Sequence, residues 1–142
     1  MGDASTEPER IYARACRAAN THSWDALGDC YAERVEMSDH RALGWDGVRD
    51  RAAMVELFQS WLTVAPDIQS QVESLASDDE HIATRWEARG HASADFGGGA
   101  FELVLVIAAS IRNGRIARIE IFDDDAAAVA RFEQFVSATD VR

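Results

Sequence analysis

The stretch Tyr31-Ala-Glu-Arg-Val-Glu-Met-Ser-Asp-His-Arg41 has the period of a β-strand with one apolar side. Val35, Met37 and Asp39 alternate and therefore share one face of this strand. If the apolar pair points inward, the Asp39 carboxylate does too, and the lost hydration disfavours its charged form. Asp39 is therefore a candidate general acid or base. The alternatives are a cap on the following turn or an ion pair with Arg41.

Helical patterns precede this strand. Thr6 and Glu9 have the spacing of a capping box, and the apolar stripe that follows predicts a helix over residues 7–20. Ser23 is the expected N-cap of a short second helix, whose apolar residues recur at intervals of three and four up to Tyr31.

A third helix is expected after the strand. The connector Ala42-Leu-Gly-Trp-Asp-Gly47 is rich in turn-forming residues, Asp46 is the expected N-cap, and Pro66 ends the helix. Its predicted inward side carries five apolar residues: Met54, Val55, Phe58, Trp61 and Leu62.

From here the period changes to two, which predicts a sheet followed by one more helix. The expected strands are residues 68–76, 81–92, 101–111 and 116–122. Arg112-Asn-Gly-Arg115 predicts a tight hairpin, and Asp95-Phe-Gly-Gly-Gly99 a loop. Asp123-Asp-Asp125 suits the start of a closing helix, whose expected inner side is Val129, Phe132, Phe135 and Val136. Three helices, one strand and an antiparallel run of four predict an α+β domain with helices covering a curved sheet.

Composition narrows the classes of function. A chain of 142 residues fits a single domain, residues 1–142. The 25 acidic against 14 basic residues give a net charge of −11, which opposes binding to nucleic acid or to acidic membranes. The sequence shows neither a signal peptide nor a spanning segment, which predicts a cytoplasmic protein. Cys16 and Cys30 lack metal-site spacing, so buried thiols are expected and no metal site is predicted.

Several short motifs together resemble a known superfamily. They are Trp24-Asp-Ala-Leu27, Tyr31-Ala-Glu33, Asp39, Gly47 and Gly114-Arg-Ile-x5-Phe-Asp123. With the order of expected elements, they resemble the SnoaL-like branch of the nuclear transport factor 2-like superfamily over nearly the whole chain. The resemblance implies a cone-shaped α+β barrel, a deep apolar pocket and homodimers through the outer sheet face. Members include cyclases, isomerases, dehydratases, epoxide hydrolases and plain binders, so the resemblance speaks to fold more than to reaction.

The resemblance also implies roles for individual residues. The segment ending at Asp39 is similar to the one that carries the catalytic aspartate of ketosteroid isomerases, which implies a proton-shuttling position. Ala15 and Val106 fall where those isomerases place their two oxyanion donors, and without such donors enolate stabilisation loses its largest electrostatic contribution. A steroid isomerase is therefore not predicted, although Tyr12 lies one turn before Ala15.

Glu120 is similar in position to an acidic residue of SnoaL-like cyclases and limonene epoxide hydrolase-like enzymes. Arg85-Trp-Glu87 has the spacing of the arginine and acid of the latter, with Glu in place of Asp at both acidic positions. The resemblance implies that Asp39, Glu87 and Glu120 divide the acid and base roles, with Arg85 orienting an oxygen. The alternative is that Arg85, Glu87 and Glu120 lie on the outer side of the sheet.

Two classes of function follow. The leading one is a cofactor-independent acid/base enzyme (isomerase, cyclase or epoxide hydrolase) that acts on a small apolar or polycyclic molecule. The alternative is a non-catalytic ligand-binding or dimerisation domain. The expected substrate-binding residues, which are equally suited to an ordinary core, are Tyr12, Trp24, Tyr31, Met37, Phe58, Trp61 and Val106. A homodimer is expected because both faces of residues 101–111 are apolar.

Overall fold

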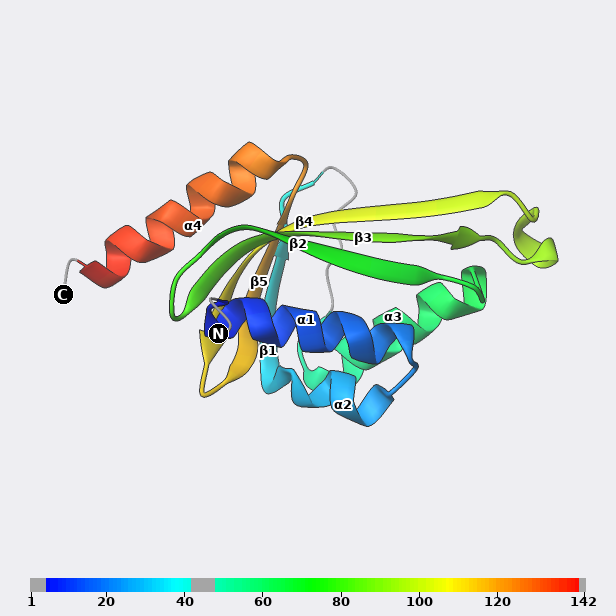
Figure 1. Cartoon of the computed structure of the whole chain (residues 1–142), viewed down its shortest axis with the longest axis horizontal. Coiled ribbons are helices and arrows are strands. Elements are labelled where there is room, and N and C mark those ends of the chain that lie inside the picture. The colour runs from blue at the N-terminus through cyan, green and yellow to red at the C-terminus, as the bar shows by residue number, and fades with distance from the viewer. Residues whose placement is uncertain (1–4, 42–47, 141–142) are drawn as a thin grey trace.

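The computed structural model describes residues 5–41 and 48–140, with side chains through Ala138. Its elements in chain order are α1 (Glu7–Asn20), α2 (Trp24–Asp29), β1 (Tyr31–Asp39), α3 (Arg51–Val64), β2 (Gln69–Ser77), β3 (His81–His91), a short 3-10 turn η1 (Ala94–Phe96), β4 (Ala100–Arg112), β5 (Arg115–Phe122) and α4 (Asp125–Asp140). The predicted α+β class, with a curved sheet and a closing helix, is confirmed (Figure 1).

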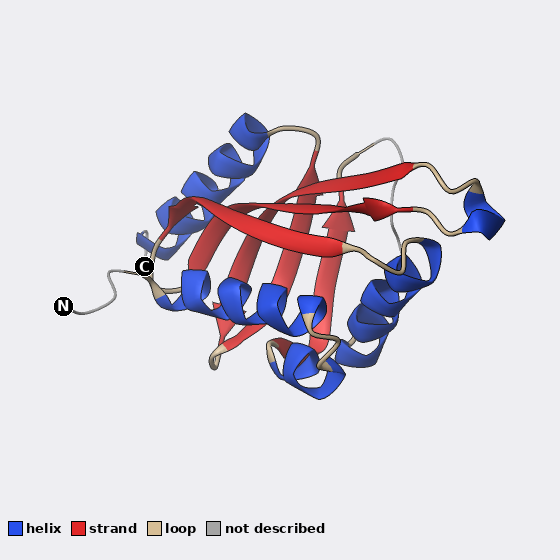
Figure 2. Cartoon of the chain, turned by 45° about the vertical axis from the view of Figure 1, so that its right-hand side comes forward, coloured by secondary structure: helices blue, strands red, loops and turns tan. Residues whose placement is uncertain are grey.

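The five strands form one sheet in the order β1-β5-β4-β3-β2. The pairs β2–β3, β3–β4 and β4–β5 are antiparallel, as expected, but β1 pairs with β5 in parallel. Parallel neighbours require a long crossover, and here α3 and three strands supply it. The edges β1 and β2 do not pair, so the sheet is strongly curved but open rather than closed into a barrel (Figure 2).

The first two helices begin as the sequence predicts but differ in their caps. The Glu9 amide donates to Thr6 Oγ1 at 3.3 Å and the Thr6 amide donates to Glu9 Oε1 at 2.8 Å, which confirms the capping box. Ser23 makes no capping bond to α2. This helix ends at Asp29, and Tyr31 is the first residue of β1 rather than part of the helix.

Helix α3 begins later than the sequence predicts. The expected N-cap, Asp46, lies outside the described residues, and so does Gly47. Asp50 is the N-cap, and its Oδ1 accepts from the Ala53 amide at 2.8 Å. A bridge to Arg34 in β1 holds Asp50 in the extended backbone conformation that an N-cap requires.

The helices cover both faces of the sheet. Helices α1, α2 and α3 pack on one face over the larger apolar core, while α4 packs on the other (Figures 1 and 2). Val106 packs beside Ala83 and Ala128 under α4, with Val129 and Phe132 nearby. The apolar character of both faces of β4 is thus explained within one chain. Val106, expected to bind substrate, lies on the outer face because Leu105 and Ile107 take the inner one.

Two further expectations concern thiols and membranes. Cys16 and Cys30 are buried free thiols, as predicted. Burial raises the pKa of Cys16 to about 11 and also raises the pKa of Cys30, so both are neutral at physiological pH. None of the helices within residues 5–41 and 48–140 is long and apolar enough to cross a membrane.

Strands β3 and β4 extend as an arm that ends at η1 (Figure 1). Gly90, near the end of β3, lies against Asp67 and Ile68 in the turn between α3 and β2. A Cβ on Gly90 would lie 2.6 Å from Asp67 Oδ1 and 3.0 Å from Ile68 Cα. Gly90→Ala is therefore expected to lower the free energy of unfolding by about 1–3 kcal/mol, measured by urea denaturation. Gly99→Ala, whose Cβ would meet nothing within 4 Å, is the control. Equal stability of the two variants would contradict the prediction.

Candidate functional site

An apolar cavity lies between the helices and the inner face of the sheet. Its volume is about 20 Å³, which is room for one group the size of a water molecule. Its wall consists of Tyr12, Tyr31, Met37, Met54, Leu57, Phe58, Trp61, Trp86, Leu105, Ile107, Ile119 and Ile121. Five of the seven expected substrate-binding residues belong to this wall. Of the other two, Trp24 lines a neighbouring void of about 10 Å³, and Val106 lies on the outer face.

Regular spacing on a few elements brings these side chains together. In α3 the wall residues recur at intervals of three and four, and in β5 Ile119 and Ile121 alternate. Phe58 forms the centre of the aromatic part. Its ring centroid lies 4.6 Å from that of Trp61 and 5.3 Å from that of Trp86, both at tilted angles. Beside these packed rings the cavity has a volume of only about 20 Å³.

Two polar atoms of the wall have no hydrogen-bond partner. They are the Tyr12 hydroxyl and the Trp86 indole nitrogen, and both side chains are at most 2% exposed. An unpaired buried donor costs about 1–3 kcal/mol, so such groups are uncommon in native proteins. Desolvation raises the pKa of the Tyr12 and Tyr31 phenols well above their ordinary value, so both keep their protons.

Asp39 lies on the inner face of β1, as its alternation predicts, and its side chain has no exposed surface. Its partner in the parallel register with β5 is Ile121, a residue of the cavity wall. Asp39 itself is not among the wall residues.

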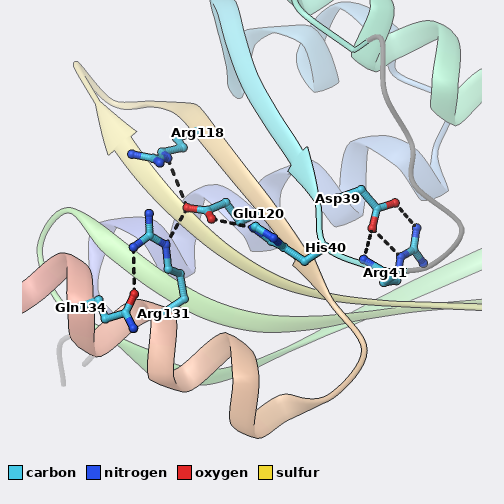
Figure 3. A network of polar contacts seen from close by, with 7 residues as sticks. All are labelled: Asp39, His40, Arg41, Arg118, Glu120, Arg131 and Gln134. Atoms are coloured by element: carbon cyan, nitrogen blue, oxygen red, sulfur yellow. Dashed lines mark hydrogen bonds and ion pairs between the residues drawn. The ribbon is translucent and has the colours of Figure 1, made fainter.

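Arg41 contacts both carboxylate oxygens of Asp39 (Figure 3). Its Nη2 lies 2.8 Å from Oδ2, while its Nε and backbone N–H donate to Oδ1 at 3.0 and 2.9 Å. The hydrogen bonds to Asp39 raise the pKa of Arg41. Asp39 therefore caps the following turn, through the Arg41 amide, and also forms an ion pair with the Arg41 side chain. Both alternatives are observed together with its position on the inner face.

Glu120 lies on the opposite side of the sheet, beneath α4 (Figure 3). Its carboxylate is 2.9 Å from His40 Nε2, 2.9 Å from Arg131 Nε and 3.3 Å from Arg118 Nε, and its side chain is only 5% exposed. Desolvation acts to raise the pKa of Glu120, but hydrogen bonds from His40 and Arg131 and the two arginine charges outweigh it, so the pKa is lowered. Glu120 is a buried, charged anchor for α4.

Arg85 and Glu87 also lie on the outer face, because Trp86 between them points into the cavity. Arg85 forms ion pairs with Glu73, at 2.8 Å, and with Asp125 at the start of α4. Glu87 accepts a hydrogen bond of 3.4 Å from Gln71. Three of the four candidate catalytic residues are thus separated from Asp39 by the sheet.

The expected substrate-binding residues did not include Trp86, Leu105 and Ile107, which line the cavity. The signal was present, since these positions alternate with the charged or outward residues of β3 and β4. The spacing of Arg85 and Glu87 led instead to the prediction that these two residues face the pocket, whereas they lie on the outer face. Within the described residues, no group of three or more metal-ligating side chains is close enough to hold a metal ion.

The fold is similar to several solved structures. IdmH, a proposed polyketide cyclase from Streptomyces antibioticus, is 23% identical over 87% of this chain and 96% of its own, with a TM-score of 0.67. AclR, a proposed hydroxylase from Streptomyces galilaeus, is 16% identical over 90% of this chain and 82% of its own, with a TM-score of 0.65. Rv0760c from Mycobacterium tuberculosis, in complex with estradiol-17β-hemisuccinate, is 13% identical over 84% and 95%, with a TM-score of 0.64. At these identities the similarity concerns the fold alone.

No curated protein sequence matches the chain. The family model of the SnoaL-like domain matches residues 12–119, which extend from the first turns of α1 into β5. This segment includes the cavity wall except for Ile121, and it includes Asp39. The chain belongs to the SnoaL-like domain family.

Proposed function

We propose that this protein binds a small, flat, apolar molecule in its interior cavity. The observation that carries the proposal is the wall itself, whose twelve residues are all apolar or aromatic and come from six elements. Ligand pockets of this kind are mainly apolar, with a few polar groups that fix orientation. The steroid ester bound to Rv0760c, which has the same fold, supports a ligand of this class.

Binding requires the wall to move, because a void of about 20 Å³ holds only one water-sized group. Met37, Met54 and Leu57 line the cavity, and unbranched methionine side chains adapt to irregular shapes at low cost. Phe58 and Trp61 separate the cavity from the second void of about 10 Å³. Displacement of these side chains would join the two spaces.

Acid/base catalysis on the bound molecule is a second, more specific candidate, and the position of Asp39 favours it. Its carboxylate is fully buried, faces inward and lies beside Ile121 of the wall. Arg41 fixes the orientation of this carboxylate by contacting both of its oxygens. Because Glu87, Glu120 and Arg85 lie on the outer face, this candidate depends on Asp39 among the four predicted catalytic residues.

A ligand screen with matched variants tests both candidates. Wild type, Asp39→Asn and the outer-face control Glu87→Gln are screened by thermal shift against polycyclic ketones, steroids, aromatic polyketides and epoxides. Products are then analysed for every ligand that stabilises the protein. We expect at least one ligand to stabilise all three proteins, with turnover reduced about 100-fold or more only in Asp39→Asn.

The outcomes separate the two candidates. Stabilisation without turnover by any of the three proteins would leave binding and exclude catalysis on those compounds. A screen without any stabilising ligand would contradict the binding proposal. Circular dichroism of Asp39→Asn shows whether the variant still folds, because this substitution also removes half of the ion pair with Arg41.

The homodimer expected through the outer sheet face stays a prediction. Helix α4 covers part of this face, and the remainder carries charged residues around the half-exposed Val104. The apolar pattern of β4 is satisfied by α4 and does not by itself require a second subunit. The cytoplasmic location likewise stays a prediction.

A further inference from the structure

A groove between α1 and α2 lies apart from the cavity and from the four candidate catalytic residues. Its volume is about 450 Å³, whereas the cavity has only about 20 Å³. Small-molecule sites of proteins have volumes of about 300–1,000 Å³, so this groove has room for a ligand without any movement of the protein. It lies on a different side of α1 from Tyr12, which lines the cavity.

The floor of the groove is apolar and consists of small side chains. Ala18 of α1, Ala26 of α2 and Cys30 line it. Ala18 is 6% exposed and Cys30 is 4% exposed. Because alanine methyl groups are short, the two helices leave space between them that longer side chains would fill. The floor can therefore receive a small apolar group.

Two arginines stand on the α1 side of the groove. Arg14 and Arg17 are three residues apart, so they share one face of the helix. Arg14 lies within hydrogen-bonding reach of the Cys30 thiol at the floor, where its positive charge acts against the desolvation that raises the pKa of this thiol. The guanidinium of Arg14 is therefore turned into the groove.

The charge of these arginines is not balanced by an ion pair. Five arginines elsewhere form ion pairs with carboxylates: Arg41, Arg85, Arg89, Arg118 and Arg131. Within residues 5–41 and 48–138, Arg14 and Arg17 form none.

The surroundings of the groove add further positive charge. Asp29 supplies the one carboxylate among the described residues that line it. Arg115, from the hairpin between β4 and β5, donates to the Asp29 carbonyl at 3.2 Å. Arg14, Arg17 and Arg115 thus face a single acid, which leaves an excess of two positive charges in a protein with a net charge of −11.

This combination of groups indicates the chemistry of a ligand. Guanidinium groups bind carboxylates and phosphates through paired, charge-assisted hydrogen bonds. An inorganic anion would satisfy the arginines but would leave the floor of Ala18, Ala26 and Cys30 uncovered. An anionic group joined to a small apolar body matches both parts of the groove.

We propose that the groove between α1 and α2 binds a small organic anion, a carboxylate or a phosphate monoester, with its charge on Arg14 and Arg17 and its apolar part on Ala18 and Ala26. This site is separate from the cavity of the proposed function. The two proposals can therefore fail independently.

Methyl NMR distinguishes the groove from the cavity. Benzoate, phenyl phosphate, inorganic phosphate and neutral benzyl alcohol are titrated into wild type. The methyl signals of Ala18 and Ala26 report on the groove, and those of Met37 and Met54 report on the cavity. We expect benzoate or phenyl phosphate to shift the alanine signals alone, and the tighter of the two identifies the anionic group. Benzyl alcohol and inorganic phosphate should bind at least about fivefold more weakly.

Arginine variants test the source of the affinity. The double variant Arg14→Gln/Arg17→Gln should raise the Kd of the organic anion about tenfold. Arg10→Gln is the matched control, because Arg10 is exposed on the same helix, lies outside the groove lining and donates to the Ser5 carbonyl. It removes one positive charge and should change the Kd less than about twofold.

Three results would overturn the inference. Weakening by Arg10→Gln as large as that of the double variant would indicate a general attraction of anions to α1. Shifts of the Met37 and Met54 signals alone would place the anion in the cavity and would support the proposed function instead. If neither organic anion shifts the alanine signals at about 20 mM, the groove is not a site for this class of ligand, while the cavity proposal, which is tested with neutral compounds, stands.

Discussion

Replacing Glu120 with alanine is expected to lower the free energy of unfolding by about 3 kcal/mol, because removing one partner of a buried ion pair leaves the others uncompensated. Glu120 is 5% exposed and meets His40, Arg118 and Arg131. The guanidinium groups of Arg118 and Arg131 also lie over the Phe135 ring, at 5.5 and 4.5 Å from its centroid. Loss of the carboxylate therefore loosens the attachment of α4. Urea denaturation followed by far-UV circular dichroism measures the effect.

The matched control is Glu87→Ala, which removes a carboxylate from the same face of the sheet. Among the residues that the structure describes, Glu87 has one weak polar contact, to Gln71 at 3.4 Å, so a change within about 0.5 kcal/mol is expected. If Glu87→Ala lowers the free energy of unfolding as much as Glu120→Ala does, then the loss of any carboxylate from the outer face destabilises the protein. That result would contradict the specific role of Glu120.

The contribution of Glu120 to the free energy of unfolding should also depend on pH. Its pKa is lower in the folded protein than its ordinary value, so its stabilising effect is fully present above about pH 4.5 and is lost as pH falls through the folded pKa. The difference in stability between wild type and Glu120→Gln should therefore be largest near pH 6 and should shrink toward pH 3. A difference that does not change with pH would show that the charge of Glu120 is not what matters.

Met54→Ala is expected to have the second large effect, a loss of about 2–5 kcal/mol together with a gain in ligand binding. Met54 is buried and belongs to the cavity wall, so truncation enlarges a void that now has a volume of about 20 Å³. Enlarged apolar cavities stay dry and bind small aromatic molecules. A thermal-shift titration with benzene or indole should therefore stabilise Met54→Ala more than it stabilises wild type.

Gln59→Ala on the same helix is the control, since Gln59 is exposed and outside the wall. It should change stability by less than about 0.5 kcal/mol and should not alter aromatic binding. If Met54→Ala binds aromatic molecules no better than Gln59→Ala, the surrounding core has collapsed into the space left by the lost side chain, and the predicted gain in binding is wrong.

The sequence predicted the elements well because their signals are local. Capping residues, turn residues and apolar periods act over a few positions, and the hairpin at Asn113-Gly114 shows this, since both residues adopt the positive φ that the turn requires. The parallel placement of β1 beside β5 could not be derived from the period of either strand, because it depends on where the chain returns after α3 and three further strands.

The candidate site was harder to predict than the fold. The alternation placed Asp39 on the inner face, but it could not reveal that Arg41 holds both of its oxygens. Glu120 was weighed as a pocket acid or a residue of the outer face. It does lie on the outer face, but it is buried there because α4 folds back over it and supplies Arg131. Contacts between elements far apart in the sequence decided the environment of both carboxylates, and such contacts leave no local pattern.

The parallel pairing of β1 with β5 has a consequence for how the chain is made. Tyr31 pairs with Ile116, so during synthesis β1 leaves the ribosome long before β5, the strand beside it in the sheet, has been made. Until β5 is complete, neither edge of β1 is paired with another strand, and pairings this distant slow folding and favour association between chains. Nascent chains that stop before residue 122 should therefore be the most prone to aggregate, and a chaperone that shields β1 would act at the step that limits the yield of folded protein.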